Sequence, residues 1–139
     1  YPDTPYPVRL GPSREPYLWP NGSLRRLGIP VCYGTDFPVV DLDPFSGIYR
    51  AVTRVHNDGL PAGGWNRAEK VDPAYALACF TRAGAYGSFR ERSLGLLKPG
   101  YAADIAFLDR NILTCDTEAI RTTRNLLTIS DGKIRYRAV

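Results

Sequence analysis

The stretch that most constrains the fold of this chain is residues 28–40, GIPVCYGTDFPVV, in which an aspartate follows a short apolar run. The run from Pro30 to Tyr33 predicts a short buried strand, and Asp36 comes soon after its C-terminal end. In barrel enzymes the catalytic residues lie at this end of the strands. Taken alone, Asp36 can bind a metal, accept a proton from water or cap a turn.

Helix signals stand on both sides of this stretch. Residues 23–27 are expected to end a short helix at Gly28, and the order helix, glycine, strand is typical of an α/β barrel. Asp43 and Pro44 predict the start of a longer helix, as its cap and its first-turn proline, and apolar residues recur at helical spacing as far as Val55. One amphipathic helix is therefore expected after the strand.

The rest of the chain changes from helical to strand periodicity near residue 94. Residues 72–89 predict a second helix, which begins with an Asp-Pro cap and is ended or loosened by two glycines. Residues 103–109 predict a strand, and residues 128–136 predict a β-hairpin because they alternate on both sides of an Asp-Gly pair. Residues 1–20, rich in Pro, Tyr and Gly, show no period and are expected to be extended.

Composition limits the class of protein. The chain has 139 residues, of which 44% are apolar, and this fits a globular fold rather than a disordered one. No apolar run has the length of a membrane span, and residues 1–20 lack the basic leader and apolar core of a signal peptide. The chain begins with Tyr and contains no Met, so we expect that polypeptide lies upstream or has been removed.

Charge and cysteine content narrow the class further. The formal net charge of +4 comes mainly from arginines scattered in ones and twos, without the run that follows a phosphate backbone, so we expect no nucleic-acid partner. The three cysteines form no C-x-x-C pair, and neither a disulfide framework nor a zinc knuckle is predicted. A reducing cytoplasm fits this pattern, with Cys32 and Cys79 packed as small core residues.

Several motifs that occur in a fixed order give the chain a family resemblance. They are GTDFPVV at residues 34–40, DPF at 43–45, AVTR at 51–54, GLLKPGYAADIAFLD at 95–109 and DGK at 131–133. This combination resembles amidohydrolase family 3. That family usually has GSDFPV in the first motif, and Thr35 is a mild departure that keeps the hydroxyl. The resemblance covers nearly the whole chain from about Leu10 onward.

The resemblance implies a composite α/β fold. Residues 1–93 are expected to be the terminal strand and helix portion of a TIM-type (β/α)8 barrel, and residues 94–139 to be C-terminal strands of a small β-sandwich. Such a barrel needs eight strands and about 250 residues, so we expect the chain to be unstable as a lone monomer. It would be completed by an upstream part of the same enzyme or by a complementing chain, and a homo-oligomer is a further option.

The resemblance also implies a function. The expected activity is hydrolysis of a non-peptide, amide-like C–N bond in a small molecule by a metal-activated water, with Asp36 as metal ligand or general base. The implied cofactor is a divalent metal, for which zinc is the expectation. Its other ligands are not in this chain, which has one histidine, His56, and no H-x-H pair. His56 is expected to lie at the surface, and the chain alone is expected to be inactive.

Other interpretations of the same residues stay open. Asp36 can instead close an Asx turn at the strand end. Phe37 and Trp65, expected to lie beside the substrate, can instead pack against their own scaffold. Asp43 is best explained as a helix cap, and Asp104 as a structural residue that ties a turn to the sandwich. A rival function for the chain is a non-catalytic module that self-associates or docks on a partner chain.

Overall fold

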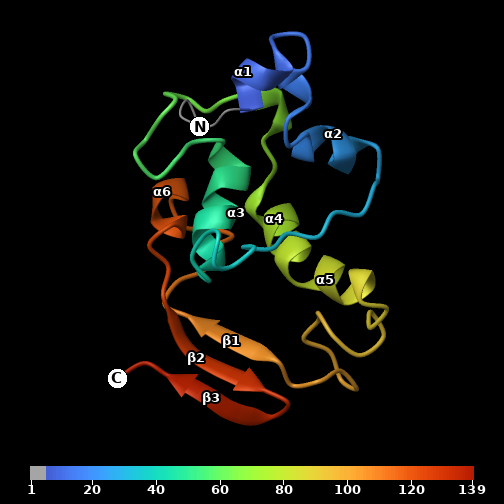
Figure 1. The fold of residues 1–139 in the computed structure, drawn as a ribbon. Coiled ribbons are helices and arrows are strands. Elements are labelled where there is room, and N and C mark those ends of the chain that lie inside the picture. Colours follow the sequence, from blue (N-terminus) through green and yellow to red (C-terminus); the bar gives the residue numbers. More distant parts are fainter. Residues whose placement is uncertain (1–5) are drawn as a thin grey trace.

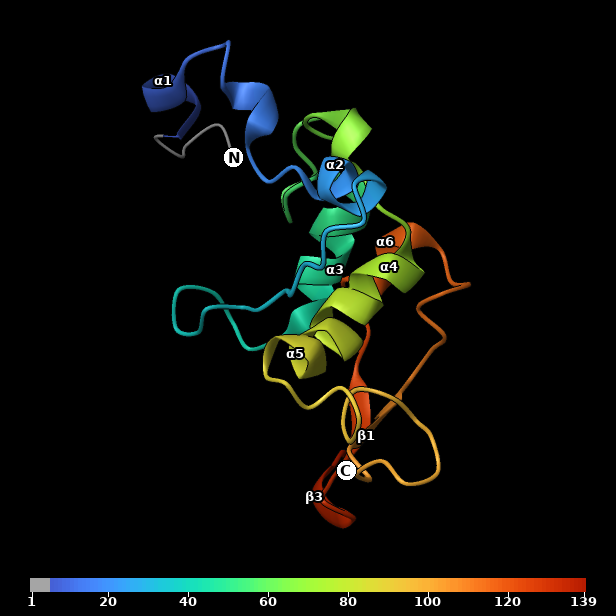
Figure 2. The ribbon, with the colours of Figure 1, turned by 90° about the vertical axis from the view of Figure 1, so that its right-hand side faces the viewer.

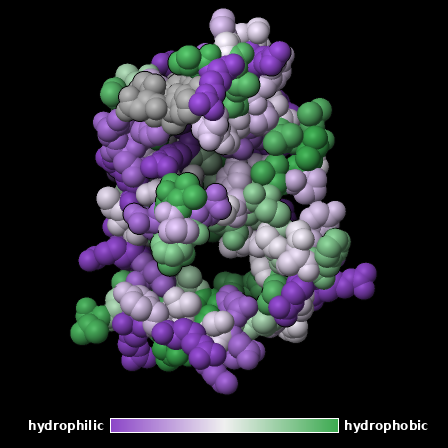
Figure 3. Space-filling view, in the orientation of Figure 1, coloured by the Kyte–Doolittle hydropathy of each residue, from purple (hydrophilic) through white to green (hydrophobic). Residues whose placement is uncertain are grey.

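The computed structural model describes residues 6–139 of the chain, apart from the side chain of Pro7. Helices form one end of the described chain and a three-stranded sheet forms the other (Figure 1). The face seen in Figure 3 is hollowed between these two parts. In chain order the elements are α1 (Tyr6–Leu10), η1 (Glu15–Tyr17), α2 (Asn21–Arg26), α3 (Pro44–Thr53), η2 (Arg67–Glu69), α4 (Pro73–Phe80), α5 (Arg82–Gly87), β1 (Ile105–Leu108), α6 (Thr117–Ile120), β2 (Asn125–Ser130) and β3 (Lys133–Arg137).

The helical core forms around α3, which packs against α4 and α6. The Asp43 carboxylate accepts a hydrogen bond from the backbone N–H of Phe45 (2.9 Å), and Pro44 occupies the first turn. The buried Tyr49 hydroxyl donates to Glu118 of α6 (2.8 Å) and so joins elements far apart in the sequence. The predicted cap and amphipathic helix are both confirmed. The buried cluster comprises Phe45, Ile48, Tyr49, Ala51, Val71, Ala76, Ile112 and Ile120.

Helix α2 ends at Arg26, and the predicted Gly28 follows directly after the cap residue Leu27. Gly28 has a φ of 69°, in the left-handed region that favours glycine. Its N–H donates to the carbonyl of Arg25, and the N–H of Ile29 donates to the carbonyl of Leu24, both at 3.0 Å. This pair of bonds is the Schellman arrangement, which fixes the direction in which the chain leaves the helix.

The strand predicted over residues 30–33 is not present. In the described chain no strand lies beside this segment, and the N–H of Tyr33 donates instead to the carbonyl of Cys79 in α4 (3.0 Å). A strand needs a neighbour to complete its hydrogen-bond ladder. Burial still alternates along the segment, because Val31, Tyr33 and Thr35 are half-buried while the residues between them are exposed. The segment therefore keeps the side-chain period of a strand without its ladder.

The second predicted helix is present as two helices, α4 and α5. The Asp72 carboxylate accepts a hydrogen bond from the N–H of Tyr75 (2.8 Å), which confirms the predicted cap. The break lies at Thr81 (φ −120°, ψ −85°), whose hydroxyl donates to the carbonyl of Leu77 (2.9 Å). Back-bonding of this kind bends helices. Helix α5 ends at Gly87, one of the two glycines expected to end the helix.

The strand predictions for the C-terminal part are confirmed. β1 pairs antiparallel with β2, and β2 with β3, in the order β1-β2-β3. The hairpin turn consists of Asp131 (φ 51°) and Gly132 (φ 71°), the left-handed pair that a type I′ turn requires. The Asp104 carboxylate accepts a hydrogen bond from the N–H of Asp131 (2.8 Å), so the predicted structural role of Asp104 is confirmed.

The expectation that residues 1–20 are extended is wrong for the part that the structure describes; residues 1–5 lie outside it. Helical turns α1 and η1 form here, and the carbonyl of Gly11 accepts bonds from two of the N–H groups that follow it. The Trp19 ring packs edge-on against Tyr6 (5.6 Å between centroids) and Trp65 (6.2 Å). Aromatic tertiary contacts therefore accompany helical turns that the sequence period does not predict.

The described chain is thus an α/β structure with a three-stranded antiparallel sheet. Its assignment to a barrel portion and a sandwich portion, divided after residue 93, stays a prediction. The loop of residues 34–43 extends away from the helices (Figure 2). Within residues 6–139 there is no helix with the length and apolar character needed to cross a membrane.

Candidate functional site

Asp36 lies in an exposed turn that is closed by a hydrogen bond between main-chain groups. Its φ is 55°, in the left-handed region that non-glycine residues seldom adopt. Its carbonyl accepts a hydrogen bond from the N–H of Val39 (2.8 Å). In the described part of the chain, the Asp36 carboxylate accepts no hydrogen bond and forms no ion pair. An Asx turn is therefore not formed here, and the carboxylate remains accessible to a ligand.

A cavity of about 460 Å³ lies between the loop that carries Asp36 and helix α3. Asp43 lines it but already caps α3, and the exposed Asp41 also lines it. Arg50 enters from α3, and its Nε is buried without an acceptor. The complete lining is Gly34, Thr35, Pro38, Val39, Val40, Asp41, Asp43, Ser46, Gly47, Arg50, Asn57 and Phe80.

Arg50 is a residue that the sequence prediction missed. The helical spacing of α3 places it on that helix, but nothing in its sequence neighbourhood marks its side chain as different from the other scattered arginines. What distinguishes it is the missing acceptor, which is a property of the tertiary structure.

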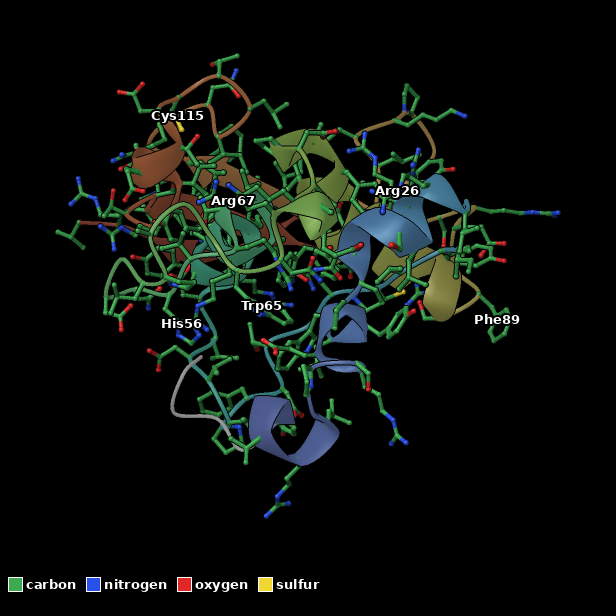
Figure 4. All side chains as sticks on the ribbon, turned by 90° about the horizontal axis from the view of Figure 1, so that it is seen from above. Arg26, His56, Trp65, Arg67, Phe89 and Cys115 are labelled. Carbon is green, nitrogen blue, oxygen red and sulfur yellow. The ribbon has the colours of Figure 1, made fainter. Side chains whose placement is uncertain are left out.

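Trp65, one of the two aromatic residues expected beside the substrate, contacts the N-terminal segment and also Arg54, which follows α3 (Figure 4). Its Nε1 donates to the Glu15 carboxylate (2.9 Å), and the guanidinium of Arg54 lies over its ring at 4.7 Å. Phe37 is 59% exposed on the loop beside Asp36. Neither residue lines the cavity next to α3, and their substrate role stays a prediction.

Arg54 is the centre of the contacts that hold the N-terminal segment. Its guanidinium donates to the carbonyls of Leu18, Trp19 and Trp65 at 3.2–3.4 Å. The planar fork of arginine presents several donors in fixed directions, which suits a cluster of carbonyl oxygens. The sequence includes Arg54 in a family motif but does not reveal this structural function.

The described residues do not fit a metal ion by themselves. Residues 6–139 contain no group of three or more His, Cys, Asp or Glu side chains that could hold one. His56 is half-buried in a turn, where its N–H donates to the carbonyl of Leu60 and its carbonyl accepts from Gly59. Asp36 stays a predicted metal ligand, and the described residues do not supply the further ligands that a metal site needs.

The segment before Asp36 packs against α4 through Tyr33. The Tyr33 ring meets Phe80 edge-on at 5.6 Å, and its buried hydroxyl has no hydrogen-bond partner. Burial, reinforced by Cys79, raises the pKa of Tyr33 above its ordinary value. Cys79 is buried, as predicted, but Cys32 is exposed, so the prediction for Cys32 is wrong. The Cys32 thiol donates to the carbonyl of Ala83 in α5 (2.8 Å), but the side chain stays exposed at the surface rather than packed in the core.

Comparison with known protein families shows the family to which this chain belongs. The family model described as the amidohydrolase family matches residues 4–136. The chain belongs to the amidohydrolase family. It is therefore a member of a hydrolase family, in agreement with the resemblance carried by its motifs.

The amidohydrolase chain is also similar to three curated proteins. It is 27% identical to the amidohydrolase YtcJ of Bacillus subtilis (strain 168) over 96% of its length and 26% of that protein. It is 30% identical to the N-substituted formamide deformylase of Arthrobacter pascens over 86% of its length and 21% of that protein. It is 33% identical to Protein LONG AFTER FAR-RED 3 of Arabidopsis thaliana over 74% of its length and 18% of that protein.

The chain thus spans about a quarter or less of these relatives. No solved structure gives a significant match.

Proposed function

We propose that this chain supplies the terminal part of a hydrolase that cleaves a non-peptide, amide-like C–N bond, with Asp36 as the group that accepts a proton from the attacking water. The observation that carries this proposal is the state of Asp36 in a chain of the amidohydrolase family. Asp36 is exposed, has a positive φ, and has a carboxylate that no structural hydrogen bond uses. Asp43, on the same loop, has a carboxylate that caps α3.

An ionised carboxylate in this position acts first as a base and then as an acid. It accepts a proton from the water that attacks the carbonyl carbon, and it then donates that proton to the leaving nitrogen as the C–N bond breaks. The carboxylate is restored at the end of the cycle. The left-handed backbone of Asp36 supports this assignment, because strained residues cluster at functional sites.

The metal and the missing part of the fold belong to the same proposal. Amidohydrolases are generally metal-dependent, and Asp36 is proposed as one ligand of a divalent metal, zinc by expectation. The other ligands come from polypeptide outside this chain. Residues 1–93 then form the last portion of a barrel and residues 94–139 part of a small β-sandwich, both completed by the remaining polypeptide.

The test compares two matched variants of the complete enzyme, purified as its source cells produce it. The assay measures amine release from a panel of small amides that begins with N-substituted formamides, the class named for the Arthrobacter relative. Asp36→Asn is expected to reduce kcat by about 10²- to 10⁴-fold, the usual contribution of a general acid–base group. Asp43→Asn is expected to retain activity, because asparagine caps helices as well as aspartate does.

Activity that survives Asp36→Asn shows that Asp36 has no catalytic function. Metal analysis of the active protein is a second check, since the proposal requires a divalent metal in it. Intact-mass measurement separates the proposal from the rival non-catalytic module. If the source cells contain only a stable, folded species of the 15.4 kDa mass of this chain, the proposal of a completed enzyme is wrong.

A further inference from the structure

We infer that the cavity between the loop of residues 34–43 and α3 is a substrate subsite for a terminal carboxamide group (CO–NH₂), whose oxygen binds Arg50 and whose N–H groups bind Asp41. This inference rests on the proposed function and names the class of small molecule that the Asp36 site would take. A cationic donor and a free carboxylate carry it, and both line the same cavity.

Arg50 supplies the donors of this subsite. The side chain is half-buried, and in residues 6–139 its guanidinium forms no hydrogen bond or ion pair. The Nε is covered by neighbouring atoms, whereas the two Nη groups are not closed off in this way. A guanidinium that is partly removed from water attracts an incoming oxygen more strongly than a fully solvated one does. Arg50 therefore offers the cavity Nη–H donors that nothing in the described chain uses.

Asp41 supplies the acceptor on the same cavity. Its side chain is exposed and forms no hydrogen bond or ion pair in the described part of the chain, so it does not pair with Arg50. Asp43, the other acidic residue of the lining, has a carboxylate that caps α3. A cation and a carboxylate that line one cavity without pairing leave room for a group between them. That group needs an acceptor for Arg50 and a donor for Asp41.

The charges of the lining favour a group without net charge. A carboxylate would be attracted by Arg50 but repelled by the carboxylates of Asp41 and Asp43. An ammonium group has no acceptor for Arg50 and would be repelled by its guanidinium. A carboxamide is neutral, its oxygen accepts hydrogen bonds, and its nitrogen donates two. It is therefore the simplest group that satisfies both side chains.

The rest of the cavity fits a short substituent beside Asp36. Its volume of about 460 Å³ lies within the range of small-molecule sites. Thr35 and Ser46 are half-buried in its lining, and their hydroxyls make no hydrogen bond in the described chain. Thr35 directly precedes Asp36, so the cavity borders the turn that carries the proposed base. Apolar contacts for a linker come from Pro38, Val39, Val40 and Phe80.

The experiment uses the complete enzyme, purified as its source cells produce it, and three N-formyl amines that differ only at the far end of the amine. One carries a carboxamide, one a carboxylate, and one an isopropyl group, which has nearly the shape of the carboxamide but no polar atom. Amine release gives kcat and KM for each compound. We expect kcat/KM for the carboxamide to exceed that for the isopropyl compound by about 10- to 100-fold, the effect of a hydrogen bond to a charged group. Arg50→Met is expected to bring this ratio close to one, mainly through a higher KM for the carboxamide.

Asp41→Asn tests the argument from charge, because asparagine keeps an acceptor and removes the negative charge. It is expected to raise kcat/KM for the carboxylate relative to the carboxamide by about 10-fold. A residue that only supports the fold would change all three compounds alike, so the two ratios separate substrate binding from a structural role. Arg92→Met is the matched control, because Arg92 is exposed and does not line the cavity. Both ratios are expected to stay as in the wild type.

The inference is wrong if the wild-type enzyme cleaves the carboxamide and isopropyl compounds equally well. It is also wrong if Arg50→Met leaves their ratio unchanged or lowers kcat/KM for all three compounds by the same factor. If none of the compounds is cleaved, calorimetry with the same compounds tests the cavity alone. The carboxamide must then bind more tightly than the isopropyl compound, and Arg50→Met must remove the difference; equal binding overturns the inference.

Failure of the catalytic proposal gives a different result. If Asp36 is the base, Asp36→Asn lowers kcat for all three compounds and leaves the ratio between the carboxamide and the isopropyl compound unchanged. Full activity of Asp36→Asn, together with a ratio that still depends on Arg50, refutes only the function proposed for Asp36.

Discussion

Replacing the buried carboxylate of Glu69 tests how the helical part of the chain is held together. Glu69 is 5% exposed and joins η2 to α2. It accepts hydrogen bonds from the N–H of Ser23 (2.7 Å) and from the Ser23 hydroxyl (2.6 Å), and it pairs with Arg26 at 3.3 Å. Glu69→Ala removes all three acceptor contacts, and Glu69→Gln removes the charge while keeping the shape.

The magnitude follows from these contacts. A hydrogen bond to a charged acceptor contributes about 1.5–3 kcal/mol, and Glu69 accepts two from Ser23. The pair with Arg26 adds about 0–1 kcal/mol, because the arginine side chain is 61% exposed. Part of this loss is offset, because the substitution also removes the cost of burying a charged carboxylate. We therefore expect Glu69→Ala to lower the free energy of unfolding by about 2–3 kcal/mol and Glu69→Gln by about 1–2 kcal/mol.

The same group makes stability depend on pH. Burial alone would raise the pKa of Glu69, but the bonds from Ser23 and the charge of Arg26 outweigh it and hold the pKa below its ordinary value of 4.5. A carboxylate with a lowered folded-state pKa contributes stability above its unfolded pKa, and that contribution disappears as pH falls. The stabilisation by Glu69 is therefore complete near neutral pH and declines below about pH 4.5.

Urea denaturation of the protein purified as its source cells produce it, at neutral pH and at about pH 3.5, measures both effects. The difference between wild type and Glu69→Gln is expected to shrink at the lower pH. Glu91→Gln is the matched control, because residue 91 is exposed, and it is expected to change stability little. If Glu69→Gln matches wild type at both pH values, the buried contacts do not stabilise the junction between α2 and η2, and the argument from contacts is wrong.

Further predictions concern the turns and the N-terminal segment. Gly28→Ala is expected to lower the free energy of unfolding by about 1 kcal/mol, because Gly28 has a positive φ. Gly84 lies within α5 and has open space at the Cβ position, so Gly84→Ala is expected to raise the free energy of unfolding by about 0.5–1 kcal/mol. The same urea titration measures both. Arg54→Lys is expected to loosen the N-terminal segment, because lysine lacks the fork of donors that arginine presents. Both tryptophans of the chain contact Arg54, so tryptophan fluorescence is expected to change. An unchanged spectrum with unchanged quenching would contradict this prediction. Asp104→Ala is expected to speed hydrogen exchange at the amide of Asp131, and equal exchange rates would show that the bond at this turn is not significant.

The elements that the sequence predicts correctly are those fixed by neighbours along the chain. Asp43 and Asp72 cap their helices because a carboxylate directly before a proline-led first turn can reach the free N–H groups of that turn. Gly28 ends α2, and Gly132 completes the hairpin turn, because both positions require a positive φ. In each case the residue that predicts the element and the groups that it contacts lie only a few positions apart in the sequence.

The elements that the sequence does not predict depend on contacts between distant segments. Helix α1 packs on Trp19 through Tyr6, and η1 is bonded to Trp65 through Glu15. No local pattern in the sequence predicts these contacts. The predicted helix after Asp72 divides at Thr81, where a side-chain bond bends it. At the candidate site, the position of Asp36 could be predicted from its motif, but the free state of its carboxylate and the missing acceptor of Arg50 could not.

The polypeptide that the proposed function requires outside this chain would account for several features between residues 28 and 42. The segment 30–33 has the burial alternation of a strand but no ladder, Cys32 is exposed, and the loop that follows presents its apolar side chains to solvent. Each of these observations has a separate trivial explanation, but a single neighbouring polypeptide would correct all of them, since it would supply a strand partner and an apolar cover together. The same neighbour would lie beside Asp36, where the proposed chemistry takes place.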